Sequence, residues 1–451
     1  MQVSTIILAA GHGTRMNSDL PKVLHHVAAA PLLHHALATA HSLEPSRIVV
    51  VTGHGGEAVA ASAIAFDEAV ETVVQDPQSG AAHAVAQAAR LLADLPGEAI
   101  VLYADTPLIR EDTLRKMLAA RQHHAVVVLG FQARDPGRYG RLLMQDSNLL
   151  AIREYDAASE DERAVALCNS GVICAEAATL FSLVAEVKNN NPKQEYYLTD
   201  IVEIARQRGL SAGVVLCDEA ETLGVNTRAQ LAEAEAAFQA RARAAALDNG
   251  VTLTAPETVF FALDTWIGRD AIIGPNVLFG PGVTVESGSE IKGFCHLDGC
   301  HISRGATVGP FARLRPGAEL AEDVHVGNFV EIKNATLGEG VKVGHLTYLG
   351  DADVGDFTNI GAGTVTCNYD GVMKHRTVIG KRAFIGSDTM LVAPVTVGDG
   401  ALTASGSVIT EDVPAEAVAI GRARQVTKPG LATRMFDKLK AIKAAKAKGQ
   451  S

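Results

Sequence analysis

The sequence predicts an α/β domain with a largely parallel sheet, followed by a parallel β-helix built from hexapeptide repeats. Two observations divide the chain in this way. Apolar runs typical of strands alternate with helical stretches over residues 1–227, whereas an aliphatic residue recurs every six positions from Ile267 onward. The glycine content changes with the pattern, because residues 251–421 hold 25 of the 42 glycines.

The first part of the chain alternates between the two kinds of element. We expect strands over residues 4–10, 47–52, 99–103, 125–130 and 171–174, and helices over residues 81–95 and 112–122. Such alternation is typical of a sheet covered by helices on both faces. Ligands of these folds bind beyond the carboxyl ends of the strands.

A glycine-containing turn, LAAGHGTRM over residues 8–16, follows the first expected strand. Its backbone N–H groups can bind phosphate oxygens. It lacks the third glycine of a dinucleotide fingerprint and the Gly-Lys-Ser/Thr of a P-loop, so neither motif applies. Because Arg15 and Lys22 add two cations to the same segment, we expect an anion-binding site here.

A carboxylate, Asp105, stands at the exit of another expected strand, in the segment YADTP over residues 103–107. Magnesium usually takes one or two protein ligands beside substrate phosphates, and Asp105 suits that role. A strand-end Asp is equally often a helix cap or a turn former, so this alternative stays open.

The second part of the chain is a repeat of six residues. Neither the 3.6-residue period of a helix nor the alternation of a strand predicts it, and a β-sandwich with irregular strands would not hold the register for so long. In a hexapeptide β-helix, three hexads make a triangular coil, each aliphatic residue points into a narrow prism, and small residues turn the corners. The aliphatic positions are Ile267, Ile273, Phe279, Val285, Ile291, Leu297, Ile302, Val308, Leu314, Leu320, Val326, Ile332, Leu337, Val343, Leu349, Val354, Ile360, Ile379, Ile385, Leu391 and Val397.

The register breaks between Ile360 and Ile379, where CNYDGVMKHR is too polar to continue the prism. We expect a loop extruded from the coil, of the kind that carries function on rigid scaffolds. A merely tolerated insertion stays an alternative.

One histidine on the prism, His345, is the candidate for a general base. It follows Lys333 and precedes the extruded loop, and with ~18 residues per coil all three lie within about two coils. Histidine is the side chain suited to proton transfer near pH 7. Glu331 is a candidate partner for orienting its ring. The pairs at residues 25–26, 34–35 and 123–124 are expected to be solvated.

Composition excludes several classes of protein. The chain is 47% hydrophobic, has no apolar run long enough to span a membrane, and shows no signal-peptide pattern around residues 3–10. The six cysteines form no CxxC pair, so we expect reduced thiols and no structural zinc. A net charge of −11 disfavours a general nucleic-acid binder. We therefore expect a soluble, cytoplasmic protein.

The predicted organisation has four parts. These are an α/β domain over residues 1–227, an alanine-rich linker helix over 228–249, the β-helix over 250–421, and a basic tail over 422–451. The helix would separate two sites. The tail carries nine basic residues and one acidic residue. It is either solvated or disordered, or it contacts nucleic acid.

The motifs taken together resemble a known family. LAAGHGTRM followed by PK, then YADTPL, EYYLTD and GVNTR, joined to a repeat that carries RPGA, GHLTYLGD and CNYDG, are similar to the bifunctional bacterial N-acetylglucosamine-1-phosphate uridyltransferases/glucosamine-1-phosphate acetyltransferases. The resemblance spans essentially the whole chain. It implies a nucleotide-diphosphosugar-transferase (Rossmann-like) domain and a left-handed β-helix.

The activities that the resemblance implies belong to a cell-wall precursor pathway. An acetyl group passes from acetyl-CoA to glucosamine-1-phosphate, and UTP then gives a uridyl group to N-acetylglucosamine-1-phosphate with release of pyrophosphate. Magnesium would serve the uridyl step. The family also implies a homotrimer with its acetyltransferase sites at subunit interfaces, with no nucleic-acid or membrane partner. In such a trimer the basic tail would border the acetyl-CoA site of a neighbouring subunit.

The resemblance also assigns residues. Arg15 and Lys22 act in the uridyl step, and His345 is the general base of the acetyl step. Asp105 and Asn226 would bind magnesium. The remaining residues that hold the nucleotide and the sugar in the first site are Leu8, Ala9, Ala10, Gly11, Gly13, Gln75, Gly80, Ala81, Tyr103, Ala104, Gly140, Glu154, Asn169, Tyr197 and Thr199. In the second site the sugar phosphate contacts Arg315, Lys333, Tyr348 and Asn359, and acetyl-CoA contacts Ala362, Asn368, Tyr369, Ser387, Ser405 and Arg422.

Three positions depart from the family pattern. Ala81 stands where the family usually has Thr, so a hydroxyl contact to the nucleotide is lost and the affinity or selectivity for UTP could change. Ala104 replaces a usual Gly, and Ser405 stands where Ala is common; both exchange one small residue for another.

Two other functions remain open at this point. A sugar-nucleotide pyrophosphorylase could use the β-helix only for assembly or regulation, but it would need no base, loop or cation pair on the prism. A non-catalytic scaffold would not need to retain Arg15, Lys22 and Asp105, all of which are present.

Overall fold

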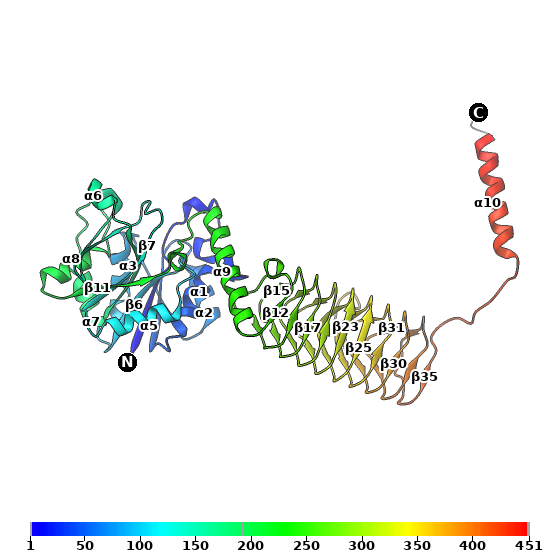
Figure 1. The fold of residues 1–451 in the computed structure, drawn as a ribbon. Coiled ribbons are helices and arrows are strands. Elements are labelled where there is room, and N and C mark those ends of the chain that lie inside the picture. Colours follow the sequence, from blue (N-terminus) through cyan, green and yellow to red (C-terminus); the bar gives the residue numbers. More distant parts are fainter. Residues whose placement is uncertain (1, 192, 449–451) are drawn as a thin grey trace. The chain divides into compact units, whose positions relative to one another are not determined.

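The computed structural model describes residues 2–191 and 193–448. The chain divides into two compact units, Met1–Cys300 and His301–Ser451 (Figure 1). No helix within the described residues is long and apolar enough to cross a membrane. In the same part of the chain, none of the six cysteines forms a disulfide bond.

The first unit is built on a nine-stranded sheet. Its central path runs β11-β7-β10-β6-β1-β4-β5, with β8 and β9 off this path. The strands are β1 (Val3–Leu8), β4 (Arg47–Thr52), β5 (Glu71–Val74), β6 (Glu98–Tyr103), β7 (Val126–Gln132), β8 (Arg141–Gln145), β9 (Asn148–Arg153), β10 (Leu167–Glu176) and β11 (Ala212–Cys217). All five expected strands are present within a few residues of their predicted bounds.

The sheet is largely parallel, as expected, apart from β10 and the β8–β9 hairpin. Strand β10 runs antiparallel to both β6 and β7. The chain passes from β7 to β10 through the hairpin, whose strands are themselves antiparallel, and so needs no crossover helix there.

Helices cover both faces of the sheet. One face packs against α1 (Leu32–His41), α2 (Gly56–Phe66) and α5 (Glu111–Ala120), and the other against α3 (Ala81–Gln87), α4 (Ala89–Leu92), α7 (Ala177–Val184) and α8 (Asp200–Gln207). Neighbouring residues of β1 show the division, because Ile6 and Ile7 point into opposite cores. The single helix expected over residues 81–95 is instead two helices, α3 and α4, with a break at Ala88.

A helix, α9 (Arg228–Asp248), covers nearly all of the residues expected for the linker and lies within the first unit. Its N-terminus is capped by Thr227, whose hydroxyl accepts a hydrogen bond from the backbone N–H of Gln230 at 3.2 Å. Short α6 (Glu160–Arg163) and the antiparallel pair β2 (His26–Val27) and β3 (Ala30–Pro31) complete the α/β part.

Short parallel strands follow α9 to the end of the first unit. They are β12 (Thr252–Leu253), β13 (Trp266–Ile267), β14 (Ile272–Ile273), β15 (Leu278–Phe279), β16 (Thr284–Val285), β17 (Glu290–Ile291) and β18 (His296–Leu297). They pair in three separate columns, β12-β14-β17, β13-β16 and β15-β18. Three columns are what the three sides of a triangular coil require.

The second unit continues the same pattern as a left-handed parallel β-helix. Strand β19 (Cys300–Ile302) spans the boundary in sequence. The others are β20 (Thr307–Val308), β21 (Arg313–Leu314), β22 (Ala318–Leu320), β23 (His325–Asn328), β24 (Glu331–Leu337), β25 (Lys342–His345), β26 (Tyr348–Val354), β27 (Asn359–Ile360), β28 (Val365–Cys367), β29 (Thr377–Ile379), β30 (Phe384–Ile385), β31 (Met390–Val392), β32 (Val395–Val397), β33 (Leu402–Thr403), β34 (Val408–Ile409) and β35 (Val418–Ala419). Every predicted prism position except Ile267 is buried.

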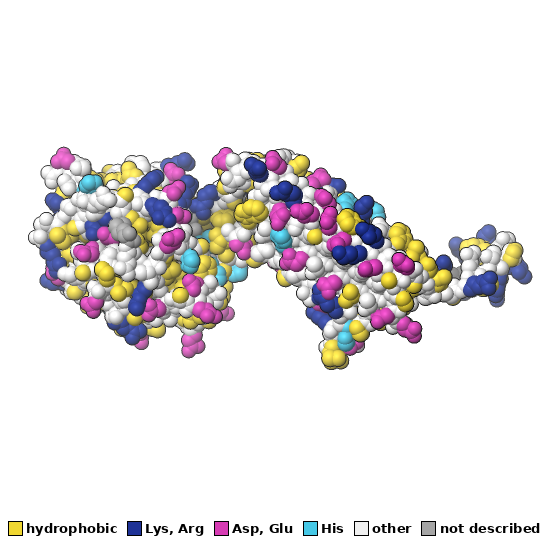
Figure 2. All heavy atoms as spheres, turned by 90° about the horizontal axis from the view of Figure 1, so that it is seen from below, with side chains coloured by type: hydrophobic (Ala, Val, Ile, Leu, Met, Phe, Trp, Pro, Cys, Tyr) yellow, Lys and Arg dark blue, Asp and Glu magenta, His cyan; other side chains and the backbone are white. Residues whose placement is uncertain are grey.

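The basic tail ends in a helix, α10 (Leu431–Lys448). Met435, Phe436, Leu439 and Ile442 on this helix are exposed. Figure 2 shows basic and hydrophobic side chains together on its surface. The last three residues of the predicted tail, 449–451, lie outside the described residues.

Candidate functional sites

A cavity of about 320 Å³ opens where β1 and β6 end. This is the edge of the sheet at which ligands of such folds bind. Ten of the predicted residues line it, namely Leu8, Ala9, Ala10, Gly11, Lys22, Gln75, Gly80, Ala81, Tyr103 and Asp105. The loop after the first strand therefore lies along this cavity.

Gly13 explains how the glycine turn reaches Lys22. Its backbone is left-handed, with φ of 63°, and a Cβ there would lie 2.6 Å from Cβ of Lys22. Only glycine combines this conformation with so close an approach. The turn can therefore pack directly against Lys22 and leave its side chain beside the cavity, where it is 9% exposed.

Lys22 contacts two side-chain oxygens that come from distant parts of the sequence. Its Nζ forms an ion pair with Oδ2 of Asp105 and donates a hydrogen bond to Oδ1 of Asn226 at 3.0 Å. The backbone N–H of Val225 also donates to the carbonyl of Asp105, at 2.8 Å. A carboxylate and an amide oxygen thus face one point that already holds a positive charge.

A second group of predicted residues lies together beside Tyr103. Thr199 donates a hydrogen bond to Oε1 of Glu154 at 3.1 Å, and the backbone N–H of Asn169 donates to the carbonyl of Gly140 at 2.8 Å. A Cβ on Gly140 would lie 3.6 Å from Cβ of Asn169 and 3.7 Å from Oε1 of Glu154. These four residues therefore form one continuous surface.

Two tyrosines border this group. Burial, followed by the charges of Asp105 and Glu154, raises the pKa of Tyr103, so its hydroxyl stays protonated and can donate a hydrogen bond. Burial likewise raises the pKa of Tyr197, and the charges of Glu195 and Glu154 act in the same direction. Both hydroxyls are therefore neutral groups facing carboxylates.

Besides Asn226, Tyr197 and the group around Glu154, three predicted residues of the first site lie outside the cavity lining. Arg15 is exposed on the 3-10 turn Thr14–Met16. Ala104 is fully buried in the core, and Gly13 packs beneath Lys22. Of the three, only Arg15 has an exposed side chain.

Sequence reasoning missed several residues that line the cavity, namely His12, Val23, Gln78, Ala84 and Glu195. Gln78 and Glu195 come from two loops that are hydrogen-bonded to each other. The N–H of Tyr196 donates to the carbonyl of Ser79 at 2.7 Å, and the N–H of Ala82 donates to the carbonyl of Tyr196 at 3.0 Å. A long sequence separation left no local signal for this contact.

His345 lies in the second unit, exposed at the end of β25. Its Nδ1 lies 2.6 Å from Oδ1 of Asn328. The two residues face each other because β23 and β25 pair in register, Asn328 opposite His345. The expected partner Glu331 is therefore wrong: it pairs instead with Tyr348, and its carboxylate contacts Arg315 at 2.8 Å and Arg313 at 3.9 Å.

Cations gather around Lys333 of β24. The close approach and charge of Lys374, followed by the charge of Arg315, lower the pKa of Lys333. Like charges held this close favour a bound anion, because it relieves their repulsion. The sequence assigns no role to Lys374, although this residue belongs to the predicted loop.

The extruded loop is present, as expected. An antiparallel bridge joins Tyr369 to Lys374, and the N–H of His375 donates to the carbonyl of Asn368 at 2.8 Å. Asp370 fastens the tip, because its carboxylate contacts His375 at 2.7 Å and accepts two backbone N–H bonds. These contacts, with that to His375 the largest, lower the pKa of Asp370 to about 2.

A buried carboxylate holds the base of this loop. Asp351 accepts hydrogen bonds from the side chains of Asn334, at 2.6 Å, and Asn368. Burial alone would raise the pKa of Asp351, but these two bonds and the charges of Lys374 and Lys333 leave it below its ordinary value. The carboxylate is therefore charged, and it anchors Asn368 to the prism.

The other predicted residues of the second site follow on successive coils. Tyr348 begins β26, and its hydroxyl lies against Gly350. The carbonyl of Ala362 accepts from Asp388 at 2.7 Å, and that of Ser387 accepts from Gly406 at 2.8 Å. Asn359 is half-buried on β27, while Ser405 and Arg422 are exposed, the latter with its side chain beside Gly406.

Two histidines expected in solvent are buried. His25 is 5% exposed and its Nδ1 lies 3.2 Å from Arg228 at the start of α9. His35 is 2% exposed, and its Nε2 lies 2.8 Å from the carbonyl of Val27. Burial lowers the pKa of both, so they pack as neutral rings.

Comparisons with known proteins match both parts of the chain. A family model described as a MobA-like NTP transferase domain matches residues 5–186, and one described as a bacterial transferase hexapeptide (six repeats) matches residues 376–411. A bifunctional protein GlmU of Cereibacter sphaeroides is 75% identical over 99% of this chain and 98% of its own. The proteins of the same name from Paracoccus denitrificans and Jannaschia sp. are 64% and 60% identical, over 97% and 99% of this chain and 98% of each relative.

Proposed function

This chain belongs to the family of the bifunctional GlmU proteins, and we infer from that membership that it makes UDP-N-acetylglucosamine in two steps. It transfers the acetyl group of acetyl-CoA to glucosamine-1-phosphate, and then the uridyl group of UTP to N-acetylglucosamine-1-phosphate, releasing pyrophosphate. The observation that carries this inference is the presence, on one chain, of the Lys22–Asp105 cluster beside a cavity and of the His345–Asn328 pair beside clustered cations.

The uridyl step needs charge neutralisation more than proton transfer. The attacking sugar phosphate is already an anion near neutral pH, so the obstacle is repulsion between it and the triphosphate. Preorganised cations stabilise such a transition state. We assign this role to Lys22, which is held at the cavity, and to Arg15, which is free to approach from its exposed turn.

Asp105 and Asn226 fit a magnesium ion. Both offer oxygen, the donor that Mg²⁺ prefers, and both reach Nζ of Lys22. When bound, the ion would neutralise charge on the phosphates. The residues proposed to bind the nucleotide are those of the cavity and Gly13 and Ala104 behind it, and those proposed for the sugar are Gly140, Glu154, Asn169, Tyr197 and Thr199.

The acetyl step needs a base, because an amine is largely protonated near neutral pH and must lose a proton to attack the thioester. The oxygen of Asn328 can only accept a hydrogen bond, so Nδ1 of His345 carries the proton when it bonds there. Nε2 is then the nitrogen that accepts the proton of the amine. Asn328 thus sets the tautomer of the base.

The surroundings of His345 suit both substrates. Arg315 and Lys333 would bind the phosphate of the sugar, with Lys374 next to them, and Tyr348 and Asn359 would hold the ring. Acetyl-CoA would lie along the coils that carry Ala362, Asn368, Tyr369, Ser387, Ser405 and Arg422. Cysteines and other nucleophiles have no part in this scheme, since the amine attacks the thioester directly.

We further propose that the chain is a homotrimer with acetyltransferase sites between subunits. Phe311, Phe329 and Leu346 occupy matching corners of successive coils, and all three are exposed, with left-handed backbones (φ of 58°, 55° and 51°). Such a conformation costs a residue with a side chain roughly 1–2 kcal/mol. These three side chains form an exposed apolar column directly beside His345, and the chain accepts a conformational cost to present it. Such a surface suits contact with a second copy of the chain.

A substitution in this column tests the trimer. Phe329→Asp places a charge in the proposed interface, and we expect it to shift the chain from trimer to monomer in sedimentation equilibrium. Acetyl transfer should fall at least about tenfold because the sites would be incomplete, while uridyl transfer is retained. Val74→Asp, at an exposed apolar position of the first unit, is the control. A Phe329→Asp trimer with normal acetyl transfer would contradict the proposal.

The remaining assignments follow from this scheme. The proposed division of the chain is a uridyltransferase domain over residues 1–227, a linker helix over 228–249, an acetyltransferase domain over 250–421 and a basic tail over 422–451. The tail would border the acetyl-CoA site of a neighbouring subunit, where CoA phosphates favour cations. We place the enzyme in the cytoplasm, without nucleic-acid or membrane partners.

Arg15 provides a specific test of the uridyl step. Arg15→Ala should lower kcat for uridyl transfer by about 10²-fold, as expected for the loss of a charge that stabilises the transition state. Steady-state pyrophosphate release from UTP and N-acetylglucosamine-1-phosphate measures it. A kcat close to that of the wild type would remove Arg15 from the mechanism.

Two assays on the intact protein test the function itself. One follows pyrophosphate release from UTP with N-acetylglucosamine-1-phosphate, and the other follows the free thiol of CoA with glucosamine-1-phosphate and acetyl-CoA. Both products are expected. Pyrophosphate without CoA would favour a pyrophosphorylase whose β-helix serves assembly alone.

A further inference from the structure

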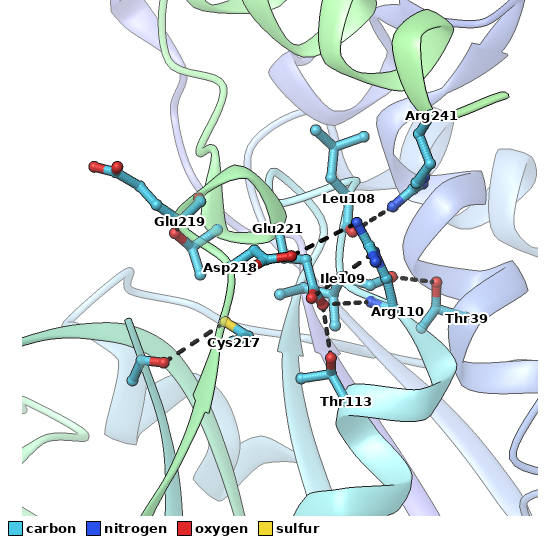
Figure 3. Close-up of polar contacts among 12 residues, drawn as sticks. Thr39, Leu108, Ile109, Arg110, Thr113, Cys217, Asp218, Glu219, Glu221 and Arg241 are labelled. Atoms are coloured by element: carbon cyan, nitrogen blue, oxygen red, sulfur yellow. Dashed lines mark hydrogen bonds and ion pairs between the residues drawn. The ribbon is translucent and has the colours of Figure 1, made fainter. Parts of the chain in front are cut away.

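The short segment that follows Asp105 is held by side chains from three different elements (Figure 3). The carbonyl of Leu108 accepts a hydrogen bond from Arg241 of α9 at 2.9 Å. The carbonyl of Ile109 accepts from the hydroxyl of Thr39 at 3.2 Å, and the N–H of Arg110 donates to Glu221 at 3.2 Å. This segment has no regular structure, so its position depends on these partners.

Glu221 is the most deeply buried charged group among these partners, at 5% exposure. The oxygen that accepts from the backbone of Arg110 also accepts from the hydroxyl of Thr113, at 2.8 Å, and the other oxygen lies 3.8 Å from Nε of Arg110. A buried carboxylate is tolerated only when it is hydrogen-bonded or paired in this way. Its bonds fix the first turn of α5 against the 3-10 turn Glu219–Thr222.

These contacts close a ring around the proposed magnesium ligands. Asp105 and Arg110 lie on one segment, and Glu221 and Asn226 lie on the other. At one end the two segments are joined by the bond from Val225 to the carbonyl of Asp105, at 2.8 Å, and at the other by Glu221. The separation of Asp105 and Asn226 therefore depends on both of these connections.

We propose that Glu221 is a positioning residue for uridyl transfer, which sets the spacing between Asp105 and Asn226 without touching substrate, and that Arg241 supports the same segment from α9. This inference rests on the proposed uridyltransferase function. It adds a role for α9, since Arg241 lies on this helix and bonds to the segment that leads away from Asp105. Groups that orient metal ligands in this way typically affect metal affinity or activity by 10- to 100-fold.

The test compares Glu221→Gln with the wild type in the intact chain. The amide keeps the shape of the side chain but removes its charge and one acceptor. We expect the Mg²⁺ concentration for half-maximal uridyl transfer to rise about 10-fold or more, with acetyl transfer unchanged. In the metal-free protein, hydrogen exchange of the Val225 amide should become faster, because its acceptor on Asp105 is held less firmly.

Glu98→Gln is the matched control. Glu98 is also a poorly exposed carboxylate in an ion pair, 2.6 Å from Nε of Arg121, and it lies at the opposite end of the strand that leads to Asp105. It should lower thermal stability without changing Mg²⁺ dependence or Val225 exchange. Arg241→Gln is a second variant and should change both readouts in the direction of Glu221→Gln, by a smaller amount.

The possible results distinguish a failure of the positioning role of Glu221 from a failure of the proposed uridyltransferase function. Wild-type Mg²⁺ dependence and wild-type Val225 exchange in Glu221→Gln would overturn the positioning role, as would equal changes in Glu98→Gln. If Glu221→Gln does not fold, Arg241→Gln decides by the same two readouts. Absence of uridyl transfer from the wild type would refute the proposed function instead. The exchange of the Val225 amide in the metal-free variants would still test whether Glu221 holds the segment that follows Asp105.

Discussion

Replacing His345 with alanine is expected to lower acetyl transfer by ~10²- to 10⁴-fold, the usual contribution of a general base. The ring is held by Asn328 with Nε2 left as the proton acceptor, and alanine provides no substitute. The measurement is the steady-state release of CoA from acetyl-CoA and glucosamine-1-phosphate. Uridyl transfer by the same protein should keep its wild-type kcat.

His41→Ala is the control, because His41 is an exposed histidine of the first unit. It should leave both activities unchanged. Equal loss of both activities in His345→Ala would indicate misfolding, and acetyl transfer at the wild-type rate would show that another group takes the proton.

Replacing Lys22 with methionine is expected to lower kcat for uridyl transfer by ~10²- to 10³-fold, as for the loss of one preorganised donor. Methionine keeps most of the side-chain volume but removes the ammonium that contacts Asp105 and Asn226. One positive charge fewer then offsets the repulsion between the phosphates. Pyrophosphate release at saturating UTP and Mg²⁺ measures the effect.

Lys193→Met is the matched control, since the Lys193 side chain is 57% exposed and pairs at the surface with Asp156. It should retain uridyl transfer. A Lys22→Met protein that also retains kcat, and loses only affinity for UTP, would assign Lys22 to ground-state binding rather than to the transition state.

The β-helix could be predicted almost residue by residue, because one side chain in six must enter the prism and the repeat makes this visible. The exception, Ile267, is half-buried. It lies on β13, which pairs on one side only, with β16, so no earlier coil covers it. Periodicity predicts which residues point inward, and it does not predict where the stack begins.

The contacts between residues within each site could be predicted less well from the sequence. The partner of His345 depends on strand register: β23 and β25 place Asn328 opposite it, and Glu331 opposite Tyr348. Chemical type alone favours the carboxylate of Glu331 as the partner of His345, and that prediction is wrong. In the first site, residue types predicted Lys22 and Asp105, whereas the bond between Glu221 and Arg110 joins residues far apart in sequence that no motif connects.

The central claim is that one chain carries two separate active sites that act in succession. The most direct test supplies glucosamine-1-phosphate, acetyl-CoA, UTP and Mg²⁺ together and measures UDP-N-acetylglucosamine. We expect the wild type to form it, Lys22→Met and His345→Ala each to form little alone, and an equal mixture of the two variants to restore it. A mixture that stays inactive, although each variant keeps its other activity, would contradict the account.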